Sequence, residues 1–196
     1  MLKDKPQFCC WKYEARSGRK TKVPYNPVTG KRAKPNQRGT FKDFSSSVAA
    51  ISKYDGIGFL VCNDICVIDL DDCFDSSGKL KSISQSIVDG FSGCYMEHSP
   101  SEKGLHIFFK ATGFNFDKTK YYINNRKLGV EVYVAGATNR FVTVTGNVYA
   151  DGDIAEKSNE LQMILDKYML RPTTVKQLLD TESQSYLSDK SVIERV

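Results

Sequence analysis

The sequence predicts an α+β domain built on a mainly antiparallel β-sheet. Short strand-like runs with two-residue alternation recur along the chain, and turn-forming Gly, Asn and Ser separate them. Only three segments have apolar residues at helical spacing, and they do not alternate regularly with the strands. Strands and helices mixed without a βαβ repeat favour the α+β class.

In the first half of the chain we expect three strands and two helices. The strands are 8–14, 56–62 and 65–71, and the helices are 40–54 and 80–91. Asn63 and Asp64 form the turn between the second and third strands. The first helix is predicted from Phe44, Val48 and Ile51, which recur at helical spacing.

In the second half we expect two strand pairs and one helix. The pairs are 94–99 with 105–111 and 129–135 with 140–146, and the helix is 153–169. Pro172 ends that helix and the residues after it are polar. We therefore expect one domain over residues 1–170, followed over 171–196 by a linker and the start of another helix.

The composition is that of an ordinary globular protein, with 40% hydrophobic and 26% charged residues. No run approaches the roughly 18 apolar residues of a membrane span, and the N-terminus lacks a secretory signal. We therefore expect no membrane partner and a cytoplasmic location. The six cysteines contain no CxxC pair and lie in apolar runs, which indicates buried, reduced thiols.

Acidic side chains converge on one face of the predicted strands. Because side chains alternate along a strand, Asp69 and Asp71 point away from Ile68 and Leu70. The same alternation places Glu131 and His106 opposite the aliphatic residues of their strands. If these strands and strand 140–146 share one sheet, one face is aliphatic. The other face then carries Asp69, Asp71, His106, Glu131, Thr143 and Thr145.

Three carboxylates at close range repel one another unless a cation lies between them. Carboxylate oxygens suit Mg²⁺ or Mn²⁺, which also hold substrate phosphates. Two such ions activate an attacking oxygen and stabilise a leaving pyrophosphate. The alternative is that Asp69 and Asp71 lie on an exposed face without a function.

The segment Ser99–His106 forms a second candidate site. The hydroxyl of Ser101, the ammonium of Lys103 and the turn N–H groups would bind an anion, with His106 beside them. A plain hairpin loop explains the same residues. Arg140 would either clamp a phosphate or pair with Glu131.

The segment from Lys12 to Lys42 is rich in Lys and Arg and poor in acids. Aromatic side chains are interleaved with the cations, as in proteins that bind single-stranded nucleic acid. The candidate nucleic-acid-binding residues are Lys20, Lys22, Lys31 and Arg32. The alternative is a solvated surface loop.

Together these pieces resemble the archaeo-eukaryotic primase superfamily, in particular its phage and plasmid primase-polymerases. The family's D-x-D motif appears as Asp69-Leu70-Asp71, its S-x-x-G-x-H stretch ends at His106, and its later acidic residue is Glu131. The order and spacing of the motifs agree, and the match covers residues 8–150. The extra Asp72 leaves open which acid pairs with Asp69.

The resemblance implies an RRM-like catalytic sheet with an N-terminal α/β unit packed against it. It implies that Asp69, Asp71 and Glu131 hold two Mg²⁺ or Mn²⁺ ions, and that Ser101, Lys103 and His106 bind a nucleoside triphosphate. The activity would be primer synthesis and DNA polymerisation on a single-stranded template in the bacterial host cytoplasm. A helicase domain would follow in the full-length chain. The alternatives are a metal-dependent nuclease and a non-catalytic RRM-like binding module.

Overall fold

The computed structural model describes residues 2–16 and 18–172, so the expected linker lies almost entirely outside the described residues. The strands are β1 (Phe8–Arg16), β2 (Arg19–Tyr25), β3 (Gly56–Leu60), β4 (Ile65–Leu70), β5 (Tyr95–His98), β6 (Leu105–Lys110), β7 (Asn124–Asn125), β8 (Val130–Tyr133), β9 (Phe141–Val144) and β10 (Val148–Ala150). The α-helices are α1 (Phe44–Ala50), α2 (Ser82–Gly90) and α3 (Ser158–Tyr168). These elements confirm the predicted α+β class.

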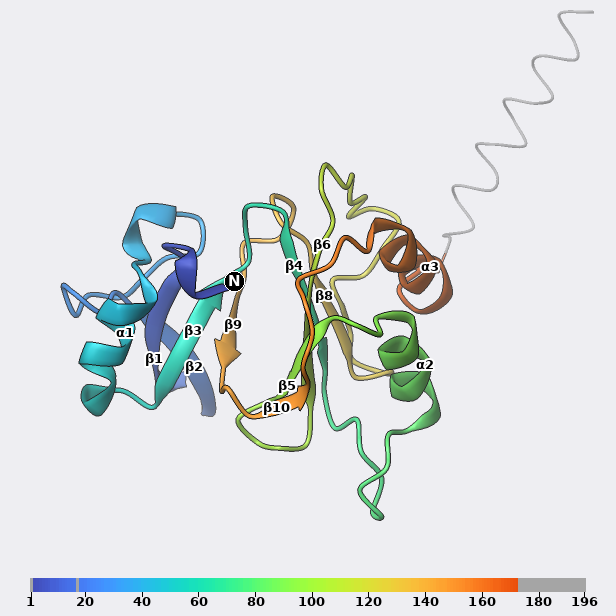
Figure 1. Cartoon of the computed structure of the whole chain (residues 1–196), viewed down its shortest axis with the longest axis horizontal. Helices are drawn as coiled ribbons and strands as arrows, with labels where there is room; N and C mark the ends of the chain where they lie inside the picture. The colour runs from blue at the N-terminus through green and yellow to red at the C-terminus, as the bar shows by residue number, and fades with distance from the viewer. Residues whose placement is uncertain (1, 17, 173–196) are drawn as a thin grey trace, which may run out of the picture.

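The strands form two antiparallel sheets. The four-stranded sheet has the order β2-β1-β3-β9, and the six-stranded sheet has the order β10-β5-β6-β4-β8-β7. Figure 1 shows the four-stranded sheet with α1 on the left, the six-stranded sheet in the middle, and α2 and α3 on the right. Within the described ranges, no helix is long and apolar enough to cross a membrane.

The centre of the six-stranded sheet has an RRM-like strand order. The chain runs from β4 through α2 to β5, then to β6 and β8, and β4 lies between β6 and β8. A connection that contains the two-residue β7 replaces the helix that would join the last two strands of an RRM. The C-terminal α3 instead packs on the sheet beside α2 (Figure 1).

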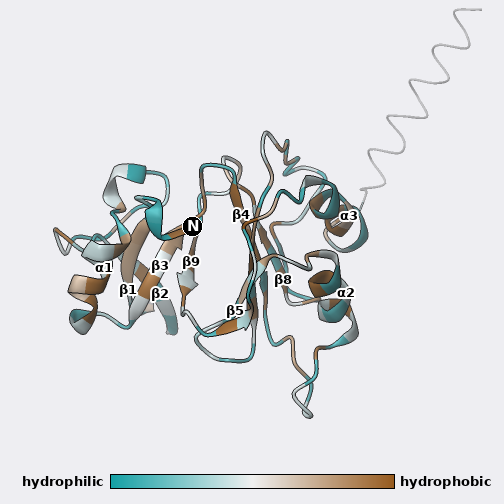
Figure 2. Cartoon of the chain, viewed as in Figure 1, coloured by the Kyte–Doolittle hydropathy of each residue, from teal (hydrophilic) through white to brown (hydrophobic). Residues whose placement is uncertain are grey.

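Each face of the six-stranded sheet has its own core. The back face carries residues such as Ile68, Ile107 and Val132, which pack against α2 and α3. On the front face, Val67 and Phe108 pack against the four-stranded sheet. Figure 2 shows hydrophobic residues concentrated on strands such as β1, β3 and β4. All six cysteines are buried and free, as expected, and burial raises the pKa of Cys73 to about 12.

The predicted pairing of strands 129–135 and 140–146 is wrong. The first becomes β8, which pairs with β4 and β7, whereas the second becomes β9, which pairs with β3. Alternation fixes which side chains share a face of one strand, but it does not select the neighbouring strand. Consequently Thr143 is buried in the four-stranded sheet and does not join the acidic face.

The first helix also differs from its prediction. It spans only Phe44–Ala50, and Val48 is 46% exposed. The side chain of Asp43 caps the helix by accepting from the Ser46 amide at 2.8 Å, which fixes where the helix begins. The helix then lies against β1 through the buried Ser47, whose carbonyl accepts from the Cys10 thiol at 3.4 Å.

Candidate functional site

The candidate site lies where β4 ends. Two glycines approach this end from the neighbouring strands. A Cβ at Gly104 would lie 2.5 Å from the Leu70 carbonyl oxygen, and one at Gly129 would lie 2.7 Å from that of Asp71. Gly129 also has a φ of +66°, which strains other residues. These glycines let the loops before β6 and β8 close around the D-x-D motif.

A row of polar side chains crosses the front face of the six-stranded sheet. Asp69 on β4 is paired in register with His106 on β6 and with Glu131 on β8. The row continues through Glu97 on β5 and Asn124 on β7. Directly opposed residues share a face of the sheet, so five strands contribute to one polar row. The structure therefore brings together three of the predicted residues from distant parts of the sequence.

Asp69 lies in the middle of this row, and its side chain is 19% exposed. The pKa of its carboxyl is raised to about 6, and burial is the largest cause. The negative charges of Asp71 and Glu131 contribute to this rise, and the nearby His106 and Lys22 oppose it. An ionised Asp69 is therefore unfavourable in the isolated chain, and a cation at this position would relieve the cost.

Asp71 lies just beyond β4 and is exposed. Its backbone N–H donates to the Gly129 carbonyl at 2.8 Å, which holds the turn against β8. The neighbouring Asp72 has a φ of +46° and pairs with Lys81 at 2.8 Å. Asp72 is therefore engaged away from the row, and Asp71 is the acid whose charge acts on Asp69.

Glu131 is held by two neighbours on the same face. Its carboxylate accepts from the Asn124 amide and, at 2.7 Å, from the Tyr133 hydroxyl. Burial raises the pKa of Tyr133, and the charges of Asp69 and Glu131 raise it further, so this hydroxyl stays a donor. These bonds order Glu131 within the row.

The donor chemistry of Asp69, Asp71 and Glu131 fits a hard divalent cation, because all three offer carboxylate oxygens and their charges interact. Among the residues that the structure describes, no group of three or more His, Cys, Asp and Glu side chains is placed so that it could hold a metal ion. The fit therefore rests on donor type and on the unfavourable charge at Asp69.

Glu97 is a member of the row that the sequence analysis did not identify. It is fully buried, and its Oε1 lies 3.6 Å from Nδ1 of His106. On its other side, His106 places Nε2 3.6 Å from Oδ1 of Asp69. The signal was available, because Glu97 follows the same alternation along its strand as His106 does along the next.

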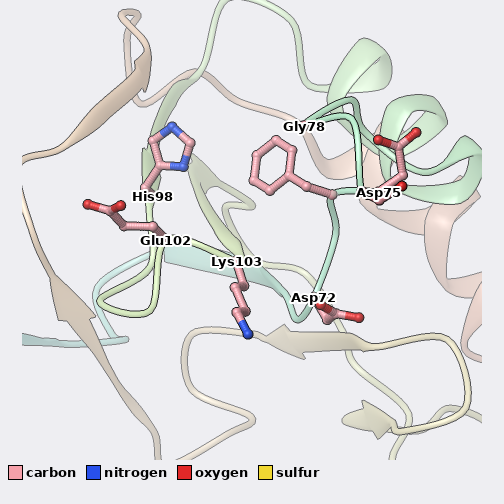
Figure 3. A pocket seen from close by; sticks show the side chains of 8 residues that line it. Asp72, Asp75, Gly78, His98, Glu102 and Lys103 are labelled. Carbon is pink, nitrogen blue, oxygen red and sulfur yellow. The ribbon is translucent and has the colours of Figure 1, made fainter.

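The Ser99–Gly104 turn is closed as a tight hairpin connection. The Ser99 and Ser101 hydroxyls are hydrogen-bonded at 3.1 Å, and the Lys103 amide donates to Ser101 at 3.4 Å. Lys103 lines a hollow of about 490 Å³ beside this turn. Figure 3 shows the Lys103 side chain extending away from the His98 ring. The remaining lining residues are Asp72, Phe74, Asp75, Ser76, Gly78, His98 and Glu102.

Arg140 precedes β9 and is exposed. Its positive charge lowers the pKa of Tyr133, which places it near the Glu131 end of the row. In the described part of the chain Arg140 forms no ion pair with Glu131. Of the two alternatives from the sequence, a direct ion pair with Glu131 is therefore absent from this structure.

The basic segment forms the end of β1, all of β2 and the loop after it. Lys22 and Arg32 line a hollow of about 320 Å³ there, together with Lys34. Arg32 pairs with Glu14 at 2.5 Å, whereas Lys20 lies 4.0 Å above the Tyr13 ring. The hollow is also lined by Val23, Pro24, Ala33, Pro35 and Asn36.

Lys22 occupies a different place from the other basic residues. Burial lowers the pKa of its ammonium, and the charges of Asp69 and Asp71 oppose that shift. Lys22 lies on β2 of the four-stranded sheet, and its ammonium is close enough to interact with Asp69 and Asp71 of the six-stranded sheet. The basic segment and the polar row are neighbours in space.

No family model matches the chain. The chain is 28% identical over 193 residues to a protein named DNA Primase-polymerase from Nitratiruptor phage NrS-1. The alignment covers 96% of this chain and 26% of that protein, so the chain spans about a quarter of the length of this curated relative. The comparison supports the primase-polymerase resemblance that the ordered motifs of the sequence predicted.

Proposed function

We propose that this chain carries the catalytic centre of a DNA primase-polymerase. The reaction is template-directed nucleotidyl transfer from nucleoside triphosphates to a 3′-hydroxyl, in primer synthesis and extension during phage or plasmid DNA replication. The observation that supports it most directly is the in-register row of His106, Asp69 and Glu131, which joins the three sequence motifs on one face. The similarity to a phage primase-polymerase supports the same reaction class.

The acids of the row would bind the cations that the reaction needs. Asp69, Asp71 and Glu131 would hold two Mg²⁺ or Mn²⁺ ions, which activate the attacking 3′-hydroxyl and stabilise the departing pyrophosphate when bound. Asn124 and Tyr133 keep the Glu131 carboxylate on the front face. Their bonds limit its rotation, which favours a defined arrangement of the reacting groups.

The other residues of the site would bind the triphosphate. His106 Nε2 points along the row toward Asp69, where it would contact a phosphate oxygen. Ser101 and Lys103 lie in the turn that leads into β6 and would neutralise the outer phosphates, with Arg140 at the other end of the row. Their positive charge would counter the charge that develops as pyrophosphate leaves.

The template would follow the basic segment. Lys20, Lys31 and Arg32 lie on or after β2, and the hollow lined by Lys22 and Lys34 adjoins them. Lys22 also carries charge toward the acids, so the segment would lead a single strand to the row. The helicase domain expected in the full-length protein remains a sequence-based prediction.

The structure disfavours the binding-module alternative. RRM-type modules stack bases on exposed aromatic side chains of the sheet. Here Phe108 and Tyr133 on the front face are buried beneath the four-stranded sheet. The exposed end of this face carries carboxylates, which repel nucleic acid unless cations cover them.

A template-directed assay with labelled nucleotides tests the proposal. The chain is incubated with single-stranded DNA, with and without a primer, in Mg²⁺ and in Mn²⁺. Incorporation that requires the chain, the single-stranded template, the nucleotides and a divalent cation supports the proposal, and incorporation without a primer supports primer synthesis. Degradation of DNA without added nucleotides would identify a nuclease, and DNA binding without either reaction would identify a binding module.

A further inference from the structure

Glu97 is a buried carboxylate for which the proposed chemistry has no direct use. It lies on β5 with no exposed surface, next to the His106 position of the row. Burying a carboxylate is costly unless donors surround it. The contacts that hold Glu97 therefore indicate what the residue does.

The carboxylate fastens the segment in which the chain passes from one sheet to the other. Oε1 accepts from the Thr145 amide and Oε2 accepts from the Gly146 amide, both at 3.0 Å. These residues connect β9 of the four-stranded sheet with β10 of the six-stranded sheet. The Tyr95 hydroxyl donates to Oε2 as well, at 3.0 Å. The Glu97 carboxylate thus accepts three hydrogen bonds, which hold it in place.

The same carboxylate faces the imidazole of His106. Its Oε1 lies 3.6 Å from Nδ1, slightly beyond hydrogen-bond range. Within the described part of the chain, Nδ1 is inaccessible to solvent and has no hydrogen-bond partner. An N–H at this nitrogen would point at a fixed negative charge, whereas a lone pair there would be repelled by it.

We infer that Glu97 is a positioning residue of the row: it keeps a proton on Nδ1 of His106 and thereby holds the ring with Nε2 on the Asp69 side. Its anchoring to Thr145 and Gly146 holds the carboxylate still and ties the connection between the sheets to the orientation of His106. The effect on turnover rests on the proposed function, but the contact itself does not.

The first test is the protonation pattern of the His106 ring, read by ¹H–¹⁵N NMR on the labelled 196-residue chain at about pH 8. The chain has only two histidines, so a His98→Gln variant assigns the signals. We expect Nδ1 of His106 to carry a proton. An unprotonated Nδ1 with the proton on Nε2 would overturn the inference. This measurement requires neither a Glu97 variant nor a catalytically active chain.

The second test is a double-mutant cycle on nucleotide incorporation with Glu97→Gln and His106→Ala. The amide keeps the size of the side chain but removes the charge that faces Nδ1. We expect Glu97→Gln to raise the nucleotide KM about tenfold and to add almost nothing when His106 is already Ala. Glu160→Gln on α3, where the acid pairs with Lys157, is the matched control and leaves KM unchanged.

Full additivity of the two variants, or a Glu97→Gln chain with unchanged KM and ring signals, would show that Glu97 does not act through His106. If Glu97→Gln does not fold, the wild-type spectrum still decides the contact. A wild-type chain that incorporates no nucleotide contradicts the proposed function instead, and the ring spectrum then decides the Glu97–His106 contact alone.

Discussion

The two faces of the six-stranded sheet are made by the same strands but differ in what they contribute. On the back face, Ile68, Ile107 and Val132 are fully buried against the helices. The residues next to these three in the strands, Asp69, His106 and Glu131, point to the front face. They belong to the polar row, which lies where the cover of the four-stranded sheet ends. The back face stabilises the fold through apolar burial, and the front face holds charges that cost stability.

The front face itself is divided along β4. Val67 packs under the four-stranded sheet, while Asp69, two residues later on the same face, lies in the polar row. The cover of the second sheet therefore ends within a single strand. The interacting carboxylates therefore lie directly next to a well-packed apolar region on the same strand. This arrangement suits a site that must hold its geometry.

The largest effect on nucleotide incorporation is expected at Asp69, which lies on the front face next to Ile68 of the back face. Asp69→Ala removes a predicted metal-binding carboxylate and should reduce nucleotide incorporation by on the order of a thousandfold or more. The melting temperature should stay level or rise, because the substitution relieves charge repulsion. Asp71→Ala should behave in the same way, and Asp72→Ala, whose acid pairs with Lys81, should remain active. A large loss of stability with activity retained would make Asp69 a structural residue.

The matched change on the opposite face is Ile68→Ala. Its side chain is fully buried in the core beneath the helices, so the cavity should lower the free energy of unfolding by about 2–5 kcal/mol. Incorporation per folded molecule should change little. Urea unfolding and an activity assay at low temperature measure the two effects. A stable Ile68→Ala chain that has lost activity would contradict the division between the faces.

The third prediction uses the pKa of Asp69, which burial raises from 3.8 to about 6. Because the folded chain holds this proton more tightly than the unfolded chain, stability should fall as the pH rises from about 4 to about 6. The loss should reach at most about 3 kcal/mol, since one pKa unit corresponds to 1.36 kcal/mol. Urea unfolding over this range, compared with Asp69→Asn, isolates the contribution.

Added Mg²⁺ or Mn²⁺ sharpens the same measurement. A cation bound at the row should stabilise the ionised acids and reduce the loss above pH 6. The Asp69→Asn variant should respond less to the metal. Identical responses of the two chains would place any bound metal away from Asp69.

A smaller effect is expected from His106→Ala on β6. The substitution removes the proposed contact to a phosphate oxygen and should raise the nucleotide KM about tenfold to thirtyfold, with DNA affinity changed less than twofold. His98→Ala provides the comparison, because His98 points to the back face and lines the hollow of Figure 3. An equal rise in KM for His98→Ala would move the phosphate site to that hollow.

The smallest effect concerns the basic segment. Reversing the charge of Lys20 and Lys31 should reduce the slope of log affinity for single-stranded DNA against log salt by about one per lost phosphate contact. Lys22 is left unchanged, because its charge acts on the acids of the row. Lys118→Glu, an exposed residue of the loop before β7, is the control. An unchanged slope would support the alternative interpretation, in which the segment is a solvated surface loop that does not bind DNA.

The alternation of the strands could be predicted from the sequence because it is a local property of the backbone. It placed Asp69, His106 and Glu131 opposite the aliphatic residues of their strands, and the structure places all three in one row. The irregular mixture of strands and helices predicted the fold class, and the ordered motifs predicted the similarity to a phage primase-polymerase. These inferences need only neighbouring residues and their order.

The neighbours of each strand were decided by tertiary structure. Strand pairing depends on which apolar faces bury one another, and an alternating pattern fits many partners. Thus β9 joins β3 instead of β8, and its connection to β10 then reaches Glu97. Only the packing of the two sheets brings Lys22 toward the acids. The sequence by itself determined the chemistry of the row, and long-range pairing decided which groups surround it.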